Sequence, residues 1–128
     1  MENSKLAGWN NRPSVSAKVE PFTAENALRG KGIRGNGRSY GDACLNDRLI
    51  SMLNHRETMV VQNGELTVSS GFLLKDVVEI CVRNGWFFPV IPGTQFVTVG
   101  GMVAADVHGK NHPTHGTIGR WIKSRTIQ

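Results

Sequence analysis

Apolar residues recur along the chain with two different periods, and these periods predict where helices and strands form. Over residues 73–81 the apolar positions follow helical spacing with charged residues between them, and Asn84-Gly85 marks the end of that helix with a left-handed cap. Strand-like runs at residues 58–61 and 65–69 flank Asn63-Gly64, a dipeptide typical of a tight hairpin turn because both residues tolerate positive φ. The middle of the chain is therefore expected to hold a β-hairpin followed by an amphipathic helix.

Shorter apolar runs predict further regular elements. We expect strands over residues 31–34, 49–53 and 86–91, the last of them buried, and a helix within residues 97–107 that begins at Thr98. Strands and helices interleaved in this order indicate the α+β class.

The two ends of the chain carry weaker patterns. Residues 1–20 mix polar positions with Trp9, which favours an extended arm with one aromatic anchor. Thr23 is a suitable N-cap for a short helix over residues 24–29, because its hydroxyl can accept a hydrogen bond from the first turn. Residues 121–122 indicate the start of another strand or helix.

Composition adds one unusual feature, the abundance of glycine. The chain has 128 residues, which suits one domain at most. Fifteen of them are glycine, well above the usual share of about 7%. They cluster in residues 30–41 and 93–119, which suggests that the backbone of these segments serves as a binding surface.

The net charge of +5 favours anionic partners such as nucleic acid, acidic lipid or a phosphate-bearing ligand. Several basic residues lie inside the glycine-rich segments, namely Lys31, Arg34, Arg38 and Lys110. That placement favours a compact phosphate ligand over a long polyanion. The alternative is that the charge serves solubility only, and composition by itself slightly favours that alternative.

The two cysteines, Cys44 and Cys81, belong to no C-x-x-C pair, so no disulfide framework is implied and a reducing compartment is expected. Cys81 is expected to be buried on the apolar face of its helix, and Cys44 to be partly exposed. No apolar run approaches the roughly 20 residues needed to span a bilayer, and the N-terminus lacks a signal-peptide core. These features predict a cytoplasmic protein without a transmembrane segment.

The first glycine-rich loop covers residues 32–42. A strand followed by such a loop can present consecutive backbone N–H groups to a phosphate, with Arg34 and Arg38 adding charge and Ser39 a hydroxyl donor. It is neither a P-loop, since no Gly-Lys-Ser/Thr follows, nor a Rossmann fingerprint, since the third glycine position is Tyr40. An ordinary glycine-rich connector is the alternative.

The second glycine-rich segment opens the predicted helix at residues 98–101. A helix start with free N–H groups is a further candidate anion site, and two such sites would suit a diphosphate with an organic body. The alternative is a loop-to-helix junction whose glycines serve packing.

Three histidines follow at His108, His112 and His115. A metal site is disfavoured, because Gly109 and Pro113 interrupt the helix that an i, i+4 ligand pair requires. A single functional histidine, His108, fits better, acting as a general base beside an anion-holding Lys110. Simple surface solvation is the alternative for both.

Taken together, three stretches resemble the FAD-binding domain of the vanillyl-alcohol-oxidase-type (PCMH-type) flavoenzymes, and within them most closely the decaprenylphosphoryl-ribose oxidases. The stretches are residues 34–42, residues 89–101 and residues 106–112, with a weaker match at residues 6–9. The resemblance implies an α+β domain of two small α/β subdomains. It also implies an N-terminal fragment, in which residues 1–20 form an arm, residues 21–128 form an incomplete FAD-binding domain, and the substrate domain is absent.

The resemblance assigns roles to individual residues. It implies that Tyr40, His108 and Lys110 face the flavin or the substrate. It implies that FAD contacts Ile33, Arg34, Gly35, Asn36, Gly37, Arg38, Ser39, Tyr40, Gly41, Asp42, Ala43, Gly93, Thr98, Val99, Gly100, Gly101, Ala105, Asp106, Val107 and His108. Related alditol and aldonolactone oxidases often carry a flavin-linked histidine where this chain has Arg38, so the resemblance implies non-covalent FAD.

The implied activity is oxidation of a sugar or alcohol hydroxyl to a ketone by hydride transfer to FAD, without a metal. The substrate could be linked to a polyprenyl phosphate, which would bring the protein to a membrane surface, and a separate reductase could be its partner. For the isolated chain, the fragment interpretation predicts weak FAD affinity and no turnover. Two alternatives stay open: a basic, non-catalytic module that binds nucleic acid or another polyanion, and a truncated chain without function.

Overall fold

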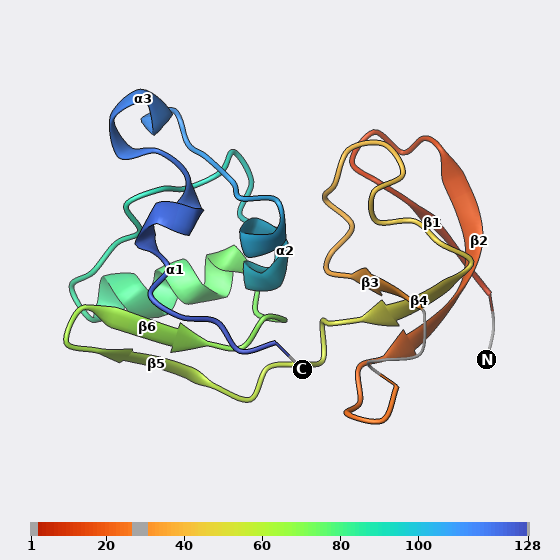
Figure 1. Cartoon of the computed structure of the whole chain (residues 1–128), viewed down its shortest axis with the longest axis horizontal. Helices are drawn as coiled ribbons and strands as arrows, with labels where there is room; N and C mark the ends of the chain where they lie inside the picture. Colours follow the sequence, from red (N-terminus) through yellow and green to blue (C-terminus); the bar gives the residue numbers. More distant parts are fainter. Residues whose placement is uncertain (1–2, 27–30, 128) are drawn as a thin grey trace. The chain divides into compact units, whose positions relative to one another are not determined.

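The computed structural model describes residues 3–26 and 31–127. Contacts divide the chain into two units, Met1–His55 with Gln128, and Arg56–Ile127. Figure 1 shows the first unit in red to yellow and the second in green to blue. The division after His55 differs from the sequence analysis, which places its boundary after residue 20. Within the described residues, no helix is long and apolar enough to cross a membrane.

The first unit is a four-stranded sheet with the order β1-β2-β4-β3. Strand β1 (Ser4–Ala7) pairs antiparallel with β2 (Ser14–Pro21), whereas β4 (Arg48–Ser51) lies parallel to both β2 and β3 (Gly32–Arg34). Leu49 and Ile50 on β4 are both buried, as expected for an inner parallel strand covered on its two faces. The strands predicted at residues 31–34 and 49–53 are confirmed within a residue or two.

Within residues 4–21, β1 and β2 pair with each other, so the region that the sequence analysis interprets as an extended arm contributes two strands to the sheet. Val15, Ala17 and Val19 alternate with polar residues along β2, and Ala17 is fully buried. This period-two pattern is an ordinary strand signal that the arm interpretation overlooked. The N-terminal hairpin is consequently part of the sheet that carries the first glycine-rich loop.

The connection from β2 toward β3 begins with a small capped turn. Thr23 Oγ1 accepts a hydrogen bond from Asn26 N at 3.2 Å, and Asn26 Oδ1 accepts one from Thr23 N at 2.9 Å. This reciprocal arrangement is a capping box, and it supports Thr23 as the cap. Residues 27–29 of the predicted helix lie outside the described part of the chain.

An ion pair joins this connection to the sheet. Lys31 Nζ donates to Glu20 Oε2 on β2, and both side chains are largely buried. The Lys31 hydrogen bond lowers the pKa of Glu20 below its ordinary 4.5, with smaller coulombic contributions from Lys31, Lys18 and Arg48, while burial acts in the opposite direction.

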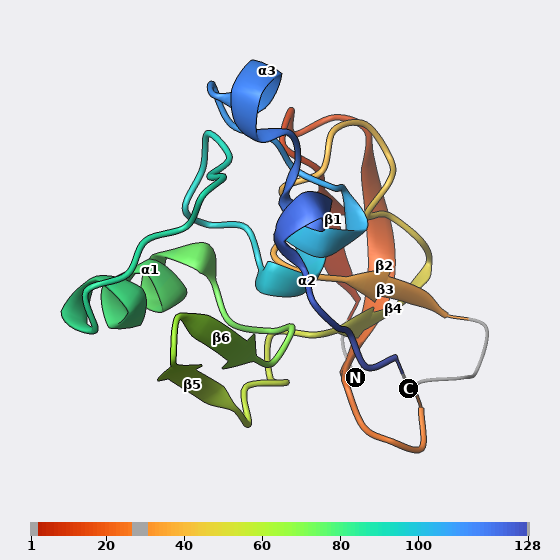
Figure 2. The same cartoon turned by 60° about the vertical axis from the view of Figure 1, so that its left-hand side comes forward.

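The second unit begins with the predicted hairpin. Strands β5 (Met59–Gln62) and β6 (Glu65–Val68) pair antiparallel around Asn63 and Gly64, whose φ angles are 52° and 75°. Helix α1 (Leu74–Arg83) lies beside this hairpin in both Figure 1 and Figure 2 and contacts β5. Both predictions are confirmed, including the left-handed residue after the end of α1, Gly85, which has a φ of 78°.

The rest of the second unit is built from short helices and loops. Helix α2 covers Val99–Ala104, the single turn α3 covers His112–His115, and a 3₁₀ turn, η1, covers Ile118–Trp121. Leu74, Val90, Met102 and Ile118 form the buried core of this unit. The helix predicted to begin at Thr98 is confirmed, although it is shorter than the apolar stretch that predicted it.

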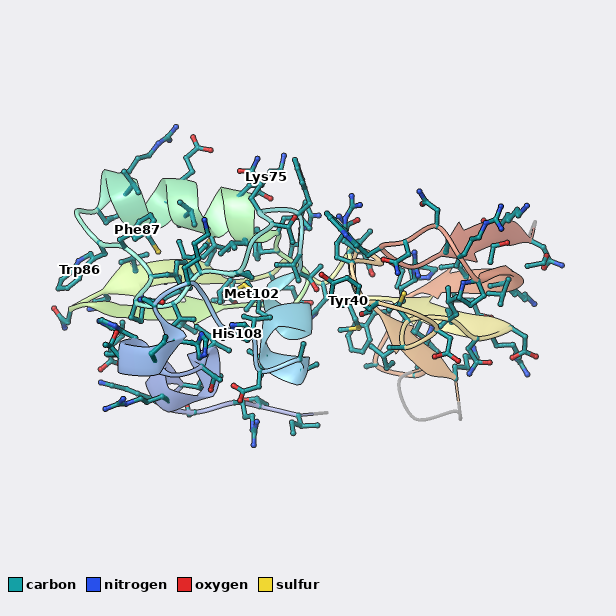
Figure 3. The ribbon with its side chains drawn as sticks, turned by 90° about the horizontal axis from the view of Figure 1, so that it is seen from above. Tyr40, Lys75, Trp86, Phe87, Met102 and His108 are labelled. Atoms are coloured by element: carbon teal, nitrogen blue, oxygen red, sulfur yellow. The ribbon has the colours of Figure 1, made fainter. Side chains whose placement is uncertain are left out.

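Residues 86–91 form no strand, which corrects the prediction of a buried one. Trp86 and Phe87 are 52% and 63% exposed, and only Val90 is fully buried. Trp86 N donates to Cys81 O at the end of α1, and Pro89 has no N–H to offer a neighbouring strand. The Trp86 ring lies over Gly64 in the hairpin turn, and Val90 belongs to the core. Figure 3 shows Trp86 and Phe87 near the end of α1, away from Met102.

The two cysteines are both buried and free. Burial raises the pKa of the Cys81 thiol, as expected for a residue on the apolar face of α1. Cys44 is only 6% exposed, so the expectation that it is partly exposed is wrong. Its position is explained by a contact with Arg34 that is described below.

Candidate functional site

The first glycine-rich loop connects β3 to β4 in the first unit. Its backbone turns through the left-handed region at Gly37 and Gly41, whose φ angles are 66° and 59°. Between these glycines Arg38, Ser39 and Tyr40 are exposed, and the exposed fraction of Tyr40 is 74%. The predicted succession of strand, glycine-rich loop and exposed donors is therefore present.

Arg34 does not extend outward with the other donors. Its Nη1 donates to Cys44 O and lies 3.1 Å from both that oxygen and Cys44 Sγ, and its Nη2 donates to Ala7 O at 3.2 Å. The guanidinium thus joins the end of β3, the end of the loop and the end of β1. The prediction that Arg34 adds charge directly at a bound phosphate is not supported by this arrangement.

Gly37 explains how the loop can fold so closely over Arg34. A Cβ atom added at this position would lie 2.0 Å from Arg34 Nη2. With its positive φ, the position excludes a side chain on two independent grounds.

A second contact holds the loop from the N-terminal hairpin. Trp9 N donates to Ser39 O at 2.8 Å, and the Arg38 guanidinium lies 5.8 Å from the centre of the Trp9 ring. A Cβ atom at Gly8 would lie 2.6 Å from Ser39 O. The sequence analysis did not predict that Gly8 and Trp9 hold this loop, although the weak family match at residues 6–9 and the anchor role expected of Trp9 pointed to this segment.

The other predicted residues of this loop differ in exposure. Ile33 lies on the edge strand β3 and is 54% exposed, while Gly35 and Asn36 are half-buried. Asp42 and Ala43 are exposed, and Asp42 O accepts a hydrogen bond from Leu45 N that closes the turn into β4. The loop therefore offers donors near its centre and a carboxylate at its end.

In the second unit, the N–H groups at the start of α2 are already used. Val99 N donates to Phe72 O and Gly100 N to Ser70 O, both at 2.9 Å. Gly101 N donates to Thr98 Oγ1 at 3.1 Å. The prediction of free N–H groups for an anion at this helix start is therefore wrong.

The residues just before α2 also accept hydrogen bonds from the first N–H groups of α1. Leu74 N donates to Val97 O at 2.9 Å, and Lys75 N donates to Gln95 O at 3.0 Å. A Cβ atom at Gly100 would lie 3.0 Å from Ser70 Cβ, so this glycine permits the close approach of the two segments. The packing interpretation of Gly100 is the one that the structure supports, whereas Gly93 has open space around it.

The segment after α2 carries the predicted base. His108 is exposed, its Nδ1 lies 3.5 Å from Gly109 O, and its ring centre lies 5.0 Å from that of His112. Lys110 is also exposed. A Cβ atom at Gly109 would lie 2.7 Å from Ile91 O, so the backbone here packs directly on residues 89–91.

Residues 105–107 hold that segment in place. Asp106 has a φ of 45°, and its Oδ1 accepts a hydrogen bond from Gly119 N at 2.9 Å. Val107 O accepts another from Ile118 N at 2.9 Å, and Val107 packs against the core. Ala105 is exposed. Asp106 thus has a structural role that sequence reasoning did not anticipate.

The remaining histidines form no metal centre in the part of the chain that the structure describes, where no group of three potential ligands gathers. His112 and His115 lie on the single turn α3, and Pro113 is at its start. The His115 ring stacks on Trp121 with ring centres 6.4 Å apart.

The site residues are therefore divided between the units. Residues 33–43 belong to the first unit, where exposed donors surround a glycine loop. Gly93, Thr98–Gly101, Ala105–His108 and Lys110 belong to the second. The open backbone at Gly41, where an added Cβ would meet nothing within 4 Å, and the exposed Arg38 and Ser39 fit a phosphate group of a dinucleotide.

Comparison with known proteins supports a FAD-binding domain. A family model described as a FAD binding domain matches residues 29–127. Decaprenylphosphoryl-beta-D-ribose oxidase from Mycolicibacterium smegmatis is 36% identical over 119 residues, which make up 90% of this chain and 26% of that protein. A D-lactate dehydrogenase from Archaeoglobus fulgidus is 28% identical over 127 residues, or 96% of this chain and 28% of that protein.

A solved structure shares the fold. It is a variant of cholesterol oxidase from Brevibacterium sterolicum, with 15% identity and a TM-score of 0.69 over 84% of this chain and 24% of that one. The chain thus spans about a quarter of the length of these relatives. The α+β fold of the PCMH-type flavoenzymes is confirmed, and the chain belongs to the FAD binding domain family of flavin-dependent oxidoreductases.

Proposed function

We propose that this chain binds FAD non-covalently and is the FAD-binding part of an oxidoreductase that oxidises a sugar or alcohol hydroxyl to a ketone. The observation that carries the proposal is the first glycine-rich loop, which exposes Arg38, Ser39 and Tyr40 beside an open Gly41. Identity to a ribose oxidase over most of the chain supports the substrate class. A guanidinium cannot replace the histidine that carries a covalent flavin in related oxidases, so Arg38 supports the non-covalent mode.

Each unit contributes its own residues to cofactor binding. In the first unit, Arg38 and Ser39 hold phosphate oxygens through charge-assisted hydrogen bonds. In the second unit, Gly93 and residues 98–101 contact the cofactor through van der Waals packing of their exposed atoms. They do not bind it through the N–H groups at the start of α2, because protein oxygens already accept hydrogen bonds from those groups.

The reaction needs a base and a hydride acceptor. Bound FAD supplies the acceptor for the two electrons and the hydrogen that leave the carbinol carbon as hydride. In the tautomer whose Nδ1 donates to Gly109 O, His108 has Nε2 available to take the hydroxyl proton. Lys110 and Tyr40 hold substrate oxygens, since both are exposed and carry donors.

Titration of the purified chain with FAD tests the binding. We expect a saturable change in flavin fluorescence and a rise in the melting temperature with FAD, and weaker binding of riboflavin, which lacks both phosphates. If saturating FAD produces neither change, the binding proposal fails.

Arg38→Gln and Arg125→Gln form a matched pair for this titration, because each removes one exposed cation and only Arg38 lies in the glycine-rich loop. We expect Arg38→Gln to weaken FAD binding by roughly tenfold, the factor that corresponds to about 1.4 kcal/mol. Equal affinity of the two variants would remove Arg38 from the site.

Because the isolated chain is expected to show no turnover, the substrate class is tested by binding: hydroxyl compounds are titrated into the FAD-loaded chain and the shift of the oxidised flavin band is measured. A shift produced by a polyprenyl-phosphate-linked pentose, and not by D-lactate, is the expected result. A shift produced by D-lactate alone would instead indicate a 2-hydroxy acid, as in the D-lactate dehydrogenase relative. His108→Gln should reduce this shift more than it reduces FAD affinity, because its proposed role is at the substrate hydroxyl.

A further inference from the structure

We infer that Arg34 is a positioning residue that holds the first glycine-rich loop in its binding shape without touching the cofactor. This inference rests on the proposed function, since it concerns the same loop. The Arg34 guanidinium makes three contacts, to Cys44 O, Cys44 Sγ and Ala7 O, at 3.1, 3.1 and 3.2 Å. These contacts fix both ends of the loop to the end of β1.

The planar guanidinium is suited to this task. It carries five N–H donors in a rigid fork, so it can join several acceptors on different segments at once. A lysine offers three donors at one point and cannot span the same acceptors. The role of Arg34 therefore depends on its shape as well as on its charge.

The loop encloses Arg34 from the other side. Gly37 is buried, and a Cβ atom there would lie 2.0 Å from Nη2. By contrast, Gly41 has a similar φ of 59° but open space where a Cβ would be. Of these two left-handed glycines, only Gly37 is required by the guanidinium.

The charge of Arg34 is not neutralised by its neighbours. Its acceptors are two carbonyl oxygens and a thiol, and within the described residues no carboxylate forms an ion pair with it. The loop therefore lies over a fixed positive charge, which favours an anion above it without direct contact.

The first experiment measures the loop without any cofactor. Cys44 is buried under the Arg34 contact, so its reaction with a thiol reagent, located by peptide mass analysis, reports whether the loop is closed. We expect Arg34→Lys and Gly37→Ala to speed Cys44 labelling at least tenfold, and Gly41→Ala, which adds the same left-handed strain without the clash, to have a much smaller effect. Cys81 in the second unit is the internal reference, because its burial is independent of the loop.

The second experiment separates positioning from direct phosphate binding. FAD and ADP affinities are measured for Arg34→Lys, Arg34→Gln, Arg38→Lys and Arg38→Gln. Positioning by shape predicts that both Arg34 variants lose affinity by a similar factor of about ten or more. At Arg38, where charge is proposed to act directly, lysine should retain most of the affinity that glutamine loses.

Three results would overturn the inference. One is near-normal FAD affinity of Arg34→Lys alongside a clear loss in Arg34→Gln, since that pattern means that a positive charge is sufficient and the shape of the guanidinium is not needed. Another is wild-type affinity of both Arg34 variants. The third is equal Cys44 labelling of Gly37→Ala and Gly41→Ala, which remains measurable even if the Arg34 variants fail to fold. A wild-type chain that protects Cys44 but binds no FAD would leave the positioning intact and contradict the proposed function instead.

Discussion

The two glycine-rich loops look alike in the sequence and differ in what their backbones do. In the first, the chain folds over the Arg34 guanidinium and exposes Arg38, Ser39 and Tyr40. In the second, the N–H groups that open α2 donate to Phe72 O, Ser70 O and Thr98 Oγ1. Glycine content therefore indicates close backbone packing in both, whereas only the first leaves charged and hydroxyl donors at its surface.

The two loops are also held in place in two different ways. The first is held mainly by a side chain from within and by the Gly8–Trp9 turn from outside. The second is held by reciprocal backbone hydrogen bonds and by the core side chain Met102 below it. The four predictions below perturb one or the other.

The largest effect is expected from Met102→Ala, which removes the core anchor of α2. Met102 is 2% exposed, and truncation of a buried methionine to alanine costs about 2–5 kcal/mol. Urea unfolding should show this loss, and Met102→Leu, which conserves volume, should cost less than about 1.5 kcal/mol. Equal stability of the two variants would mean that α2 does not depend on this packing.

Gly8→Ala should come next. The added Cβ would lie 2.6 Å from Ser39 O and 2.8 Å from Gly41 O, and backbone atoms cannot move aside as a flexible side chain can. A destabilisation of about 1–3 kcal/mol is expected from such overpacking, together with weaker FAD binding. Gly93→Ala is the control for the stability measurement alone, since its Cβ meets nothing within 4 Å. A harmless Gly8→Ala would show that the hairpin does not brace the loop.

Thr98→Val tests the hydrogen bond at the start of α2. Loss of the acceptor for Gly101 N should cost about 1 kcal/mol, as for other N-caps. Thr67→Val makes the same change at an exposed strand position and should have little effect on the urea midpoint. If both variants unfold at the same urea concentration, the cap does not stabilise α2.

The smallest effect is expected from Glu20→Gln, in the sheet that carries the first loop. Because the Lys31 hydrogen bond lowers the pKa of Glu20, the charged form stabilises the folded state above pH 4.5, and this stabilisation is lost as the pH falls through the lowered value. Glu20→Gln should therefore melt slightly below the wild type at pH 7 and together with it in strong acid. A constant difference at every pH would contradict the ion pair.

Local patterns predicted much of the fold, and their limits are visible in particular residues. Asn63-Gly64, Gly85 and Thr98 each act within a few residues of their own position, so their turn and caps could be predicted. The strands at the N-terminus could also have been predicted from Val15, Ala17 and Val19. The apolar residues 86–91 could not be assigned, because their state depends on whether a neighbouring strand exists to pair with them.

The candidate site likewise has features that local motifs predicted and features that only the structure revealed. The family motifs identified the loop, His108 and Lys110, and the match to a FAD binding domain family confirmed the cofactor class. They did not reveal the inward direction of Arg34, the contacts of Gly8 and Trp9, or the hydrogen bond from Gly119 to Asp106. Each of these depends on a partner at least 10 residues away along the chain.

The sequence by itself determined the elements with local signals, the two glycine-rich segments and the flavoenzyme family, because turn chemistry, helical period and motif order are properties of neighbouring residues. Only the tertiary structure decided which donors remain exposed. Arg34 and Arg38 are four positions apart in one loop, yet the carbonyl groups of Ala7 and Cys44 hold the first inside, whereas the second lies at the surface. Whether a polar group is available to a ligand depends on which acceptors the fold brings to it, and those acceptors come from other segments of the chain.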